Sequence, residues 1–208
     1  MARVAVISCG LGNVQSLCDA LRRIGAFPIV CHNRENLMAE PFDRIFLPGV
    51  GAVSYYLKNL RAFKLDQALA ELVIGQKVPF LGICVGMQVL ATESHEFDLC
   101  YGLNFIPGKV EKICVHDQNT KLPHVGWNDV NYARDGILYE SLNGKEFYFV
   151  HSYCFNCPPK YALAYTNHGQ QFVSIVSSEN IFGVQFHPEK SSRNGEILLQ
   201  NFVEHGRL

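Results

Sequence analysis

The sequence has 208 residues, of which 48% are hydrophobic, and 18 basic residues nearly balance 19 acidic ones to give a net charge of -1. This size and composition predict a globular protein with a sizeable core, and we expect one domain over residues 1–208. The charge balance gives no reason to expect a nucleic-acid or membrane partner, and no stretch approaches the roughly 20 apolar residues of a membrane span. Because the N-terminus does not resemble a signal peptide, we expect a cytoplasmic location.

Eight cysteines are present, and an even number raises the question of disulfides. The chain is long, is not cysteine-dense and has no export signal, so reduced thiols are the better interpretation. Cys154 and Cys157 form a C-x-x-C, but a zinc site needs a second such pair and a thioredoxin-type site lies at a helix start. We therefore expect no metal and no cofactor.

In the first half of the chain, short apolar strands alternate with helices. Strands are expected at 3–8, 28–31, 44–49 and 79–83, the third of them broken by Pro48, and helices at 13–24, 66–74 and 85–91. Val14, Leu17, Leu21 and Ile24 share one face of the first helix. Such alternation predicts a parallel α/β sheet.

The second half contains short β-like runs between about 101 and 186, with turns at 143–144 and 168–169, and a final helix at about 192–203. The runs are KVEKICV (109–115), EFYFVHSYCF (146–155), YALAYT (161–166), QFVSIVSS (171–178) and IFGVQFH (181–187). These runs predict antiparallel strands that either extend the same sheet or form a second small sheet. The predicted fold class is therefore α/β, with a central, mainly parallel sheet flanked by helices.

Cys84 lies between Gly82 and Gly86, where a strand-like run changes into a helical one. G-x-C-x-G is the cysteine analogue of the nucleophile elbow, a tight corner that lifts the reactive side chain out of the sheet. The N–H groups at the start of the following helix favour a thiolate there. A buried cysteine that only fits a crowded turn explains this stretch equally well.

The segment GVQFHPEK, residues 183–190, offers a base for such a thiol. His187 and Glu189 point the same way in an extended chain, and Pro188 keeps His187 out of the α region. His187 is the candidate base and Glu189 the group that orients it. A core histidine is the alternative, although a His-Pro-Glu triplet closing a β-run favours the catalytic interpretation.

Attack on a carbonyl also needs an oxyanion hole. The glycine-rich segment LPGVGAV, residues 47–53, offers the N–H of Val50 or Gly51, and the N–H of Val85 is the natural second donor. A phosphate loop is the competing interpretation, but the segment has neither the G-x-G-x-x-G nor the Walker pattern.

Together, these segments resemble the class I glutamine amidotransferases and their Cys-His-Glu triad. Within that family, GLGNVQSL (10–17), LPHVGWN (122–128) and FYFVHSY (147–153) resemble the glutaminase subunits of imidazole glycerol phosphate synthases. The resemblance implies a flavodoxin-like fold, and hydrolysis of L-glutamine through a thioester. It also implies a heterodimer with a (β/α)8-barrel cyclase subunit that receives the ammonia.

The same resemblance implies roles for further residues. Gln88, Glu96, His151 and Ser152 fall where the family holds glutamine; their structural alternatives are helix-surface residues and an ordinary strand end. Asn13, Trp127 and Lys190 lie in segments that face the cyclase in the family, and the alternative for Trp127 is core filling.

One departure keeps other interpretations open. Ser8 and Cys9 stand where the family usually has an acidic residue and a tyrosine, in a segment that communicates with the partner. A related amidotransferase that feeds another synthase, such as one amidating a cell-surface sugar, is an alternative. A non-catalytic binding subunit and a cysteine hydrolase acting alone are two others.

Overall fold

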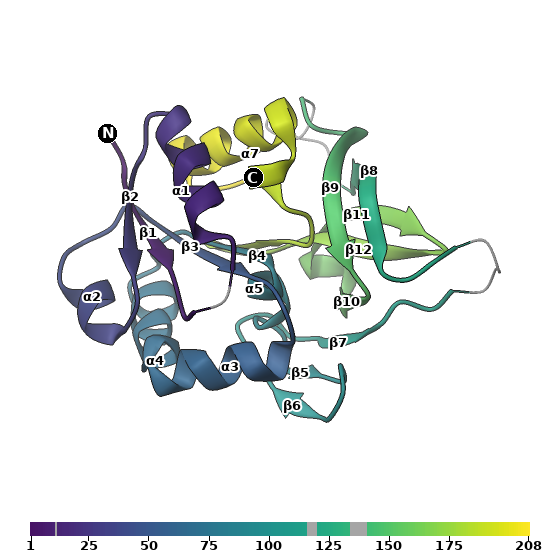
Figure 1. The fold of residues 1–208 in the computed structure, drawn as a ribbon, viewed down its shortest axis with the longest axis horizontal. Helices are drawn as coiled ribbons and strands as arrows, with labels where there is room; N and C mark the ends of the chain where they lie inside the picture. The colour runs from purple at the N-terminus through teal and green to yellow at the C-terminus, as the bar shows by residue number, and fades with distance from the viewer. Residues whose placement is uncertain (11, 116–119, 134–140) are drawn as a thin grey trace.

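The fold is seen in a computed structural model, which describes residues 1–10, 12–115, 120–133 and 141–208. A nine-stranded mixed sheet with the order β2-β1-β3-β4-β13-β12-β11-β8-β9 runs through the molecule (Figure 1). Its strands are β1 (Arg3–Ile7), β2 (Phe27–Cys31), β3 (Arg44–Gly49), β4 (Phe80–Cys84), β8 (His124–Tyr132), β9 (Lys145–His151), β11 (Ala162–His168), β12 (Gln170–Ser178) and β13 (Ile181–Val184). Pairing is parallel from β2 to β13 and antiparallel from β13 to β9.

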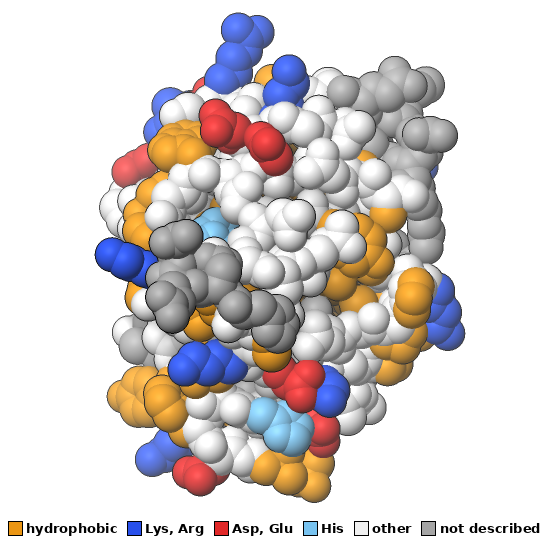
Figure 2. All heavy atoms as spheres, turned by 90° about the vertical axis from the view of Figure 1, so that its right-hand side faces the viewer, with side chains coloured by type: hydrophobic (Ala, Val, Ile, Leu, Met, Phe, Trp, Pro, Cys, Tyr) orange, Lys and Arg blue, Asp and Glu red, His pale blue; other side chains and the backbone are white. Residues whose placement is uncertain are grey.

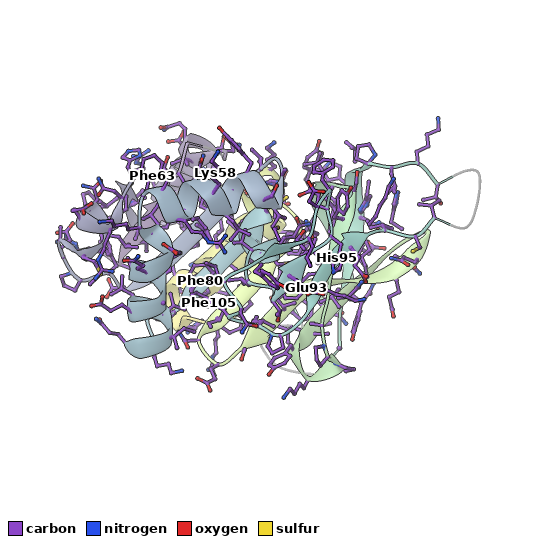
Figure 3. All side chains as sticks on the ribbon, turned by 90° about the horizontal axis from the view of Figure 1, so that it is seen from below. Lys58, Phe63, Phe80, Glu93, His95 and Phe105 are labelled. Atoms are coloured by element: carbon purple, nitrogen blue, oxygen red, sulfur yellow. The ribbon has the colours of Figure 1, made fainter. Side chains whose placement is uncertain are left out.

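A second sheet, with the order β10-β7-β5-β6, lies beside the antiparallel end of the first. Its strands are β10 (Tyr153–Asn156), β7 (Lys109–Lys112), β5 (Glu93–Ser94) and β6 (Cys100–Tyr101). Glu93 and His95 lie side by side in the view from below (Figure 3), with His95 Nε2 at 2.9 Å from Glu93 Oε1. The predicted α/β fold is confirmed, and the antiparallel strands both extend the main sheet and build a second one.

Helices cover both faces of the parallel part of the main sheet. Helices α1 (Val14–Arg23) and α7 (Ser192–His205) lie on one face, and α3 (Val53–Ala62) and α4 (Leu65–Leu69) lie on the other (Figure 1). The shorter elements are α2 (Arg34–Met38), a π-helical segment (Ala70–Gly75), α5 (Val85–Gln88) and 3-10 turns at Pro159–Tyr161 and Pro188–Lys190.

Helix α1 buries the predicted Leu17 and Leu21 against the sheet, because residues four apart share a helix face. On the same face of the sheet, α7 packs Phe202 edge-to-face on Phe46 of β3, with ring centroids 5.2 Å apart. None of the helices in the described ranges is long and apolar enough to cross a membrane. On the face shown in Figure 2, basic and acidic side chains are interspersed, in keeping with the net charge of -1.

The prediction that Pro48 breaks its strand is wrong. Strand β3 continues to Gly49, and Pro48 pairs with Ile83 of β4. The neighbouring strand β1 pairs with β3 only as far as Phe46, so the missing N–H of Pro48 leaves no gap in a ladder on that side.

The predicted helix over 85–91 is also shorter than expected, because α5 ends at Gln88. The N–H groups of Leu103, Asn104 and Phe105 donate to the carbonyl groups of residues 89, 91 and 90. Those carbonyls are thus bonded to a distant loop rather than to a continuing helix.

Candidate active site

Three sequence motifs meet because three neighbouring strands of the sheet are parallel. Strand β4 lies between β3 and β13, with Cys84 paired to Gly49 on one side and Ile83 paired to Val184 on the other. The carboxyl ends of parallel neighbours lie at the same edge of a sheet, where open α/β sheets bind ligands. The segments that follow β3 and β13, which begin with Val50 and Gln185, therefore flank Cys84.

Cys84 occupies a tight corner between β4 and α5. Its backbone has φ 56° and ψ -111°, a conformation that a residue with a Cβ rarely adopts. A Cβ on Gly86 would lie 1.7 Å from the carbonyl oxygen of Leu47, and one on Gly82 would lie 2.3 Å from that of Gly86. The predicted strand-to-helix corner is present, and its close backbone contacts explain the two glycines.

His187 and Glu189 form a buried pair, with His187 Nδ1 2.9 Å from Glu189 Oε1 and side chains 2% and 1% exposed. His187 is extended as predicted, but Glu189 lies in a 3-10 turn, so the expectation of an extended chain through both residues is wrong. The turn nevertheless brings the carboxylate back to the imidazole. Among the described residues, His187 Nε2 and Glu189 Oε2 have no hydrogen-bond partner.

The electrostatics of this pair favour a charged imidazole. Burial lowers the pKa of His187, but the nearby Cys84 thiolate and the Glu189 carboxylate outweigh burial and raise that pKa to about 10. Opposite charges a few ångströms apart stabilise each other strongly when water is excluded. The arrangement therefore favours a protonated His187 beside the Cys84 sulfur.

A cavity of about 260 Å³ opens in front of Cys84. Its lining residues are Val50, Gly51, Cys84, Val85, Gln88, Glu96, Val150, His151, Ser152, Tyr153 and His187. The predicted oxyanion and glutamine-binding residues thus all lie on its wall, and so do Cys84 and His187. Gly51 has φ 85°, a left-handed conformation that suits glycine.

Two of the predicted ligand-binding residues already have fixed positions. Glu96 Oε2 accepts the N–H of Val53 at 2.6 Å, and burial raises the pKa of Glu96 while this hydrogen bond opposes the rise. Gln88 is 4% exposed and donates from Nε2 to the carbonyl oxygen of Tyr153 at 3.0 Å. The helix-surface interpretation of Gln88 is therefore wrong.

Sequence reasoning missed several residues around this cavity. Gln185 is fully buried and donates from Nε2 to Cys84 Sγ at 3.7 Å, while His124 Nδ1 lies 3.0 Å from His151 Nε2. Gln185 is two residues before His187, so the period of an extended chain was a signal that could have found it. No comparable signal in the sequence connects His124 with His151.

A thiol, an imidazole, a carboxylate and a glycine-rich backbone segment around one small cavity can carry out acyl transfer through a covalent intermediate. The family model for "Glutamine amidotransferase class-I" matches residues 5–205 of this chain. The chain belongs to the class I glutamine amidotransferase family. The residues that carried the family resemblance in the sequence are therefore residues of an amidotransferase.

Relatives from several organisms match this amidotransferase over nearly its full length. "Imidazole glycerol phosphate synthase subunit HisH 1" of Campylobacter jejuni is 40% identical over 96% of this chain and 98% of its own. "Imidazole glycerol phosphate synthase subunit HisH 2" of Vibrio vulnificus is 40% identical, over 97% of this chain and 94% of its own. The HisH subunit of Methanothermobacter thermautotrophicus is 39% identical over 97% and 98%.

Solved structures agree on the fold of the amidotransferase. PurLQS of Thermotoga maritima aligns with a TM-score of 0.75 at 18% identity, covering 99% of each chain. A structure described as a glutamine amidotransferase aligns with a TM-score of 0.73 at 20% identity, covering 98% of each chain.

The residues assigned to a partner surface lie outside the cavity of the amidotransferase. Trp127 on β8 is half exposed, which excludes simple core filling, and packs edge-to-face on Tyr148. Lys190 Nζ lies 5.8 Å from the centroid of the same Tyr148 ring. Asn13 lies apart from this pair in the sequence, immediately before α1.

None of the eight cysteines of the amidotransferase, all of which lie in the described ranges, forms a disulfide. Burial raises the pKa of Cys154 to about 12 and that of Cys157 to about 11. Both thiols of the C-x-x-C are therefore protonated at neutral pH, which favours a structural role.

Proposed function

We propose that this amidotransferase is the glutaminase subunit of imidazole glycerol phosphate synthase. It hydrolyses glutamine to glutamate and ammonia, and a cyclase subunit uses the ammonia to make imidazole glycerol phosphate and aminoimidazole carboxamide ribotide in histidine biosynthesis. The observation that carries this proposal is the convergence of Cys84, His187 and the Val50–Gly51 segment on one cavity. Full-length relatives with this name, about 40% identical, support the choice of synthase.

In the first half of the reaction, the Cys84 thiolate attacks the side-chain amide carbon of glutamine. The amide oxygen becomes an oxyanion that accepts hydrogen bonds from the N–H of Val85 and from Val50 or Gly51. One such donor lowers the barrier by about 3 kcal/mol. The intermediate then collapses to a γ-glutamyl thioester, and the leaving ammonia takes its proton from the His187 imidazolium.

In the second half, neutral His187 removes a proton from water, which attacks the thioester carbon. The C–S bond breaks, glutamate leaves, and the thiolate–imidazolium pair is restored. Glu189 orients the imidazole and stabilises its charged form throughout, and its 2.9 Å contact with Nδ1 supports this role.

The α-amino and α-carboxylate groups of glutamine are held by the wall opposite the elbow. Glu96 is the acidic group on this wall and suits the ammonium, while the backbone of His151 and Ser152 suits the carboxylate. Gln88 uses only its amide nitrogen in the hydrogen bonds seen among the described residues, so its carbonyl oxygen can accept a hydrogen bond from the ligand.

The cyclase is a (β/α)8 barrel that docks on the side of Trp127, Lys190 and Asn13, and ammonia passes to it through a tunnel. The complex is a cytoplasmic heterodimer. Ser8 and Cys9 depart from the family pattern in the segment that communicates with the partner, so an amidotransferase serving another synthase is the second candidate.

Replacing the nucleophile tests the proposal. In the purified complex with the cyclase, Cys84→Ala abolishes product formation from glutamine but leaves formation from added ammonium salt intact. Cys157→Ala is the matched control, because this half-buried thiol lies outside the cavity, and it keeps both activities. A covalent glutamine analogue labels Cys84 in preference to the other seven thiols, as read by peptide mass spectrometry.

Each alternative gives a different result. If Cys84→Ala lowers both activities equally, ammonia transfer is the wrong mechanism. If the chain hydrolyses glutamine but does not bind the cyclase, the second candidate is favoured. Partner-free turnover of peptides or esters, without turnover of glutamine, favours a hydrolase that acts alone.

A further inference from the structure

Gln185 is a buried polar residue that the mechanism above does not use. It follows β13, is 0% exposed, and its backbone N–H donates to the carbonyl oxygen of Ser174 at 2.9 Å. An amide buried this deeply destabilises the fold unless its hydrogen bonds are made. Gln185 makes one of these bonds to the candidate nucleophile, since its Nε2 donates to Cys84 Sγ at 3.7 Å.

The orientation of the Gln185 amide follows from its neighbours. Gln88 has one side-chain atom within 3.0 Å of the Tyr153 carbonyl oxygen, and that atom must be the nitrogen because a carbonyl only accepts. The same Gln88 nitrogen lies 3.0 Å from Gln185, so the Gln185 atom that faces it must be the oxygen. The Gln185 nitrogen is therefore the atom that faces the Cys84 sulfur.

We infer that Gln185 is a positioning residue for the nucleophile, whose amide N–H holds the Cys84 sulfur and stabilises it as a thiolate. A hydrogen bond to a charged acceptor is roughly twice as strong as one between neutral groups, so this N–H favours the thiolate over the thiol. The inference rests on the proposed function, because it adds a support to the same attacking sulfur. Gln185 itself does not touch the substrate, since it is absent from the cavity wall.

Other groups around Cys84 also influence its charge. His187 supplies the positive charge, and Glu96, His151 and Tyr153 are the other titratable groups on the cavity wall beside the thiol. Tyr56 of α3 also interacts electrostatically with the thiol. None of these groups is changed when the Gln185 amide is replaced, so the effect of its N–H can be measured separately.

The test compares Gln185→Met, which keeps the size but removes the donor, with Gln185→Glu, which keeps an oxygen for Gln88 and places a carboxyl group beside the sulfur. The matched control is Gln170→Met, because Gln170 makes the same type of contact, from Nε2 to Cys154 Sγ at 3.9 Å, away from the cavity. The rate of iodoacetamide alkylation is followed at Cys84 by peptide mass spectrometry over a range of pH. The kcat and KM for glutamine are measured in the complex with the cyclase.

Gln185→Met is expected to slow alkylation of Cys84 near pH 7 by about 10-fold or more and to move the alkylation profile to higher pH. It lowers kcat by a similar factor and leaves KM nearly unchanged. Gln185→Glu, which disturbs packing least, slows alkylation at least as much, and Gln170→Met leaves both readings at the wild-type level. A wild-type alkylation profile in either folded Gln185 variant overturns the inference.

The alkylation measurement does not depend on glutamine turnover. If the wild-type chain fails to hydrolyse glutamine with the cyclase but the Gln185 variants still alter alkylation, the proposed function fails and the positioning role stands. If turnover follows the proposal while alkylation does not respond to Gln185, the positioning role fails alone.

Discussion

Buried polar side chains gather around Cys84. Five of them are at most 7% exposed: Gln88, His124, His151, Gln185 and His187. Burial of polar groups is unfavourable unless they are hydrogen-bonded, so natural proteins keep such clusters where chemistry requires them. His187 Nδ1 contacts Glu189 at 2.9 Å, so Nε2 is the nitrogen that serves as base in the proposed reaction.

At this scale we predict the effect of Glu189→Gln. The amide keeps the size of the side chain but removes the negative charge that helps to raise the pKa of His187 to about 10, so the pKa of His187 falls. Side-chain NMR of the histidine ring measures this change. The kcat for glutamine in the complex falls by roughly 100-fold or more, because the imidazole loses both its orientation and its charge stabilisation.

The control for this prediction is Glu204→Gln. Glu204 and His205 also form a carboxylate–imidazole contact, at 3.8 Å, but both side chains are exposed on α7 and lie outside the cavity. This variant keeps the wild-type kcat. A His187 titration that does not move in Glu189→Gln contradicts the role assigned to Glu189.

At the scale of elements, the site depends on how closely the β4–α5 corner approaches β3. Gly49 of β3 packs against Gly86, since a Cβ on Gly49 would lie 2.9 Å from the Gly86 nitrogen and 2.9 Å from the Tyr56 ring. The Tyr56 hydroxyl in turn donates to the Pro48 carbonyl oxygen at 2.5 Å. Helix α3 therefore fixes the strand that leads into the Val50–Gly51 segment.

We predict that Gly86→Ala strongly destabilises the protein. The added methyl group would lie 1.7 Å from the Leu47 carbonyl oxygen, which is backbone of a central strand and cannot move without disturbing the sheet. The expected loss in the free energy of unfolding is about 3 kcal/mol, at the upper end of the usual range for overpacking. Urea unfolding followed by circular dichroism measures it.

Gly75→Ala is the matched control for this substitution. A Cβ on Gly75 would have its nearest contact at 4.0 Å, and the residue ends a helical segment. Alanine is therefore tolerated there, or stabilises by up to about 1 kcal/mol through the unfolded state. Equal stability of Gly86→Ala and the wild type would show that the corner has more room than its contacts indicate.

The limits of sequence prediction are clearest at this scale. Periodicity predicted α1 and α7 well, because each helix buries one apolar stripe. It failed for β8, which was not predicted as a strand: Gly126, Asn128 and Asp129 weaken the strand signal, and pairing with β9 and β11 holds the segment extended. It also overextended α5, because the bonds that end that helix come from a loop more than ten residues away.

The candidate site was predicted from three short sequence motifs, and the structure explains why that was possible. The three motifs around Cys84 each close one of three neighbouring parallel strands. Nothing local in the residues indicated that the β9–β10 junction, which includes His151 and Ser152, forms the opposite wall. That part of the cavity was expected only through the family resemblance, since it depends on long-range packing.

For the whole molecule, the cavity lies between the parallel strands of the main sheet and the antiparallel strands that extend it. We call these antiparallel strands, β8, β9, β11 and β12, the antiparallel addition. A chain of hydrogen bonds crosses the addition, from Asn128 Nδ2 to His124 Nε2 at 3.1 Å, from His124 Nδ1 to His151 Nε2 at 3.0 Å, and from His151 Nδ1 to the Tyr153 carbonyl oxygen at 2.8 Å. A neutral imidazole has one donor nitrogen and one acceptor nitrogen, whereas a charged one has two donors. Each hydrogen bond in this chain therefore pairs a donor with an acceptor only when both imidazoles are neutral. The antiparallel addition therefore depends on two uncharged histidines.

These histidines predict how stability depends on pH. Burial, reinforced by the charges of His151 and His168, lowers the pKa of His124 to about 3, and burial lowers that of His151 to about 4. Because both values lie below the ordinary pKa of about 6.5, the unfolded chain binds more protons than the folded protein between roughly pH 6.5 and 4. The contribution of the two neutral histidines to the free energy of unfolding is complete above about pH 6.5. It is lost as the pH falls, by up to about 1.4 kcal/mol per pH unit for each histidine.

His124→Gln isolates the contribution of one histidine, because the amide can still donate to His151 but does not titrate. The free energy of urea unfolding of this variant is expected to fall less steeply between about pH 6 and 5, by roughly the 1.4 kcal/mol per pH unit of a single proton. Above about pH 7.5 the slopes of variant and wild type coincide, since His124 is then neutral in both the folded and the unfolded chain. Equal slopes between about pH 6 and 5 as well would mean that His124 takes up its proton in the folded protein. The hydrogen-bond chain across the antiparallel strands would then contain a charged His124 rather than two neutral imidazoles.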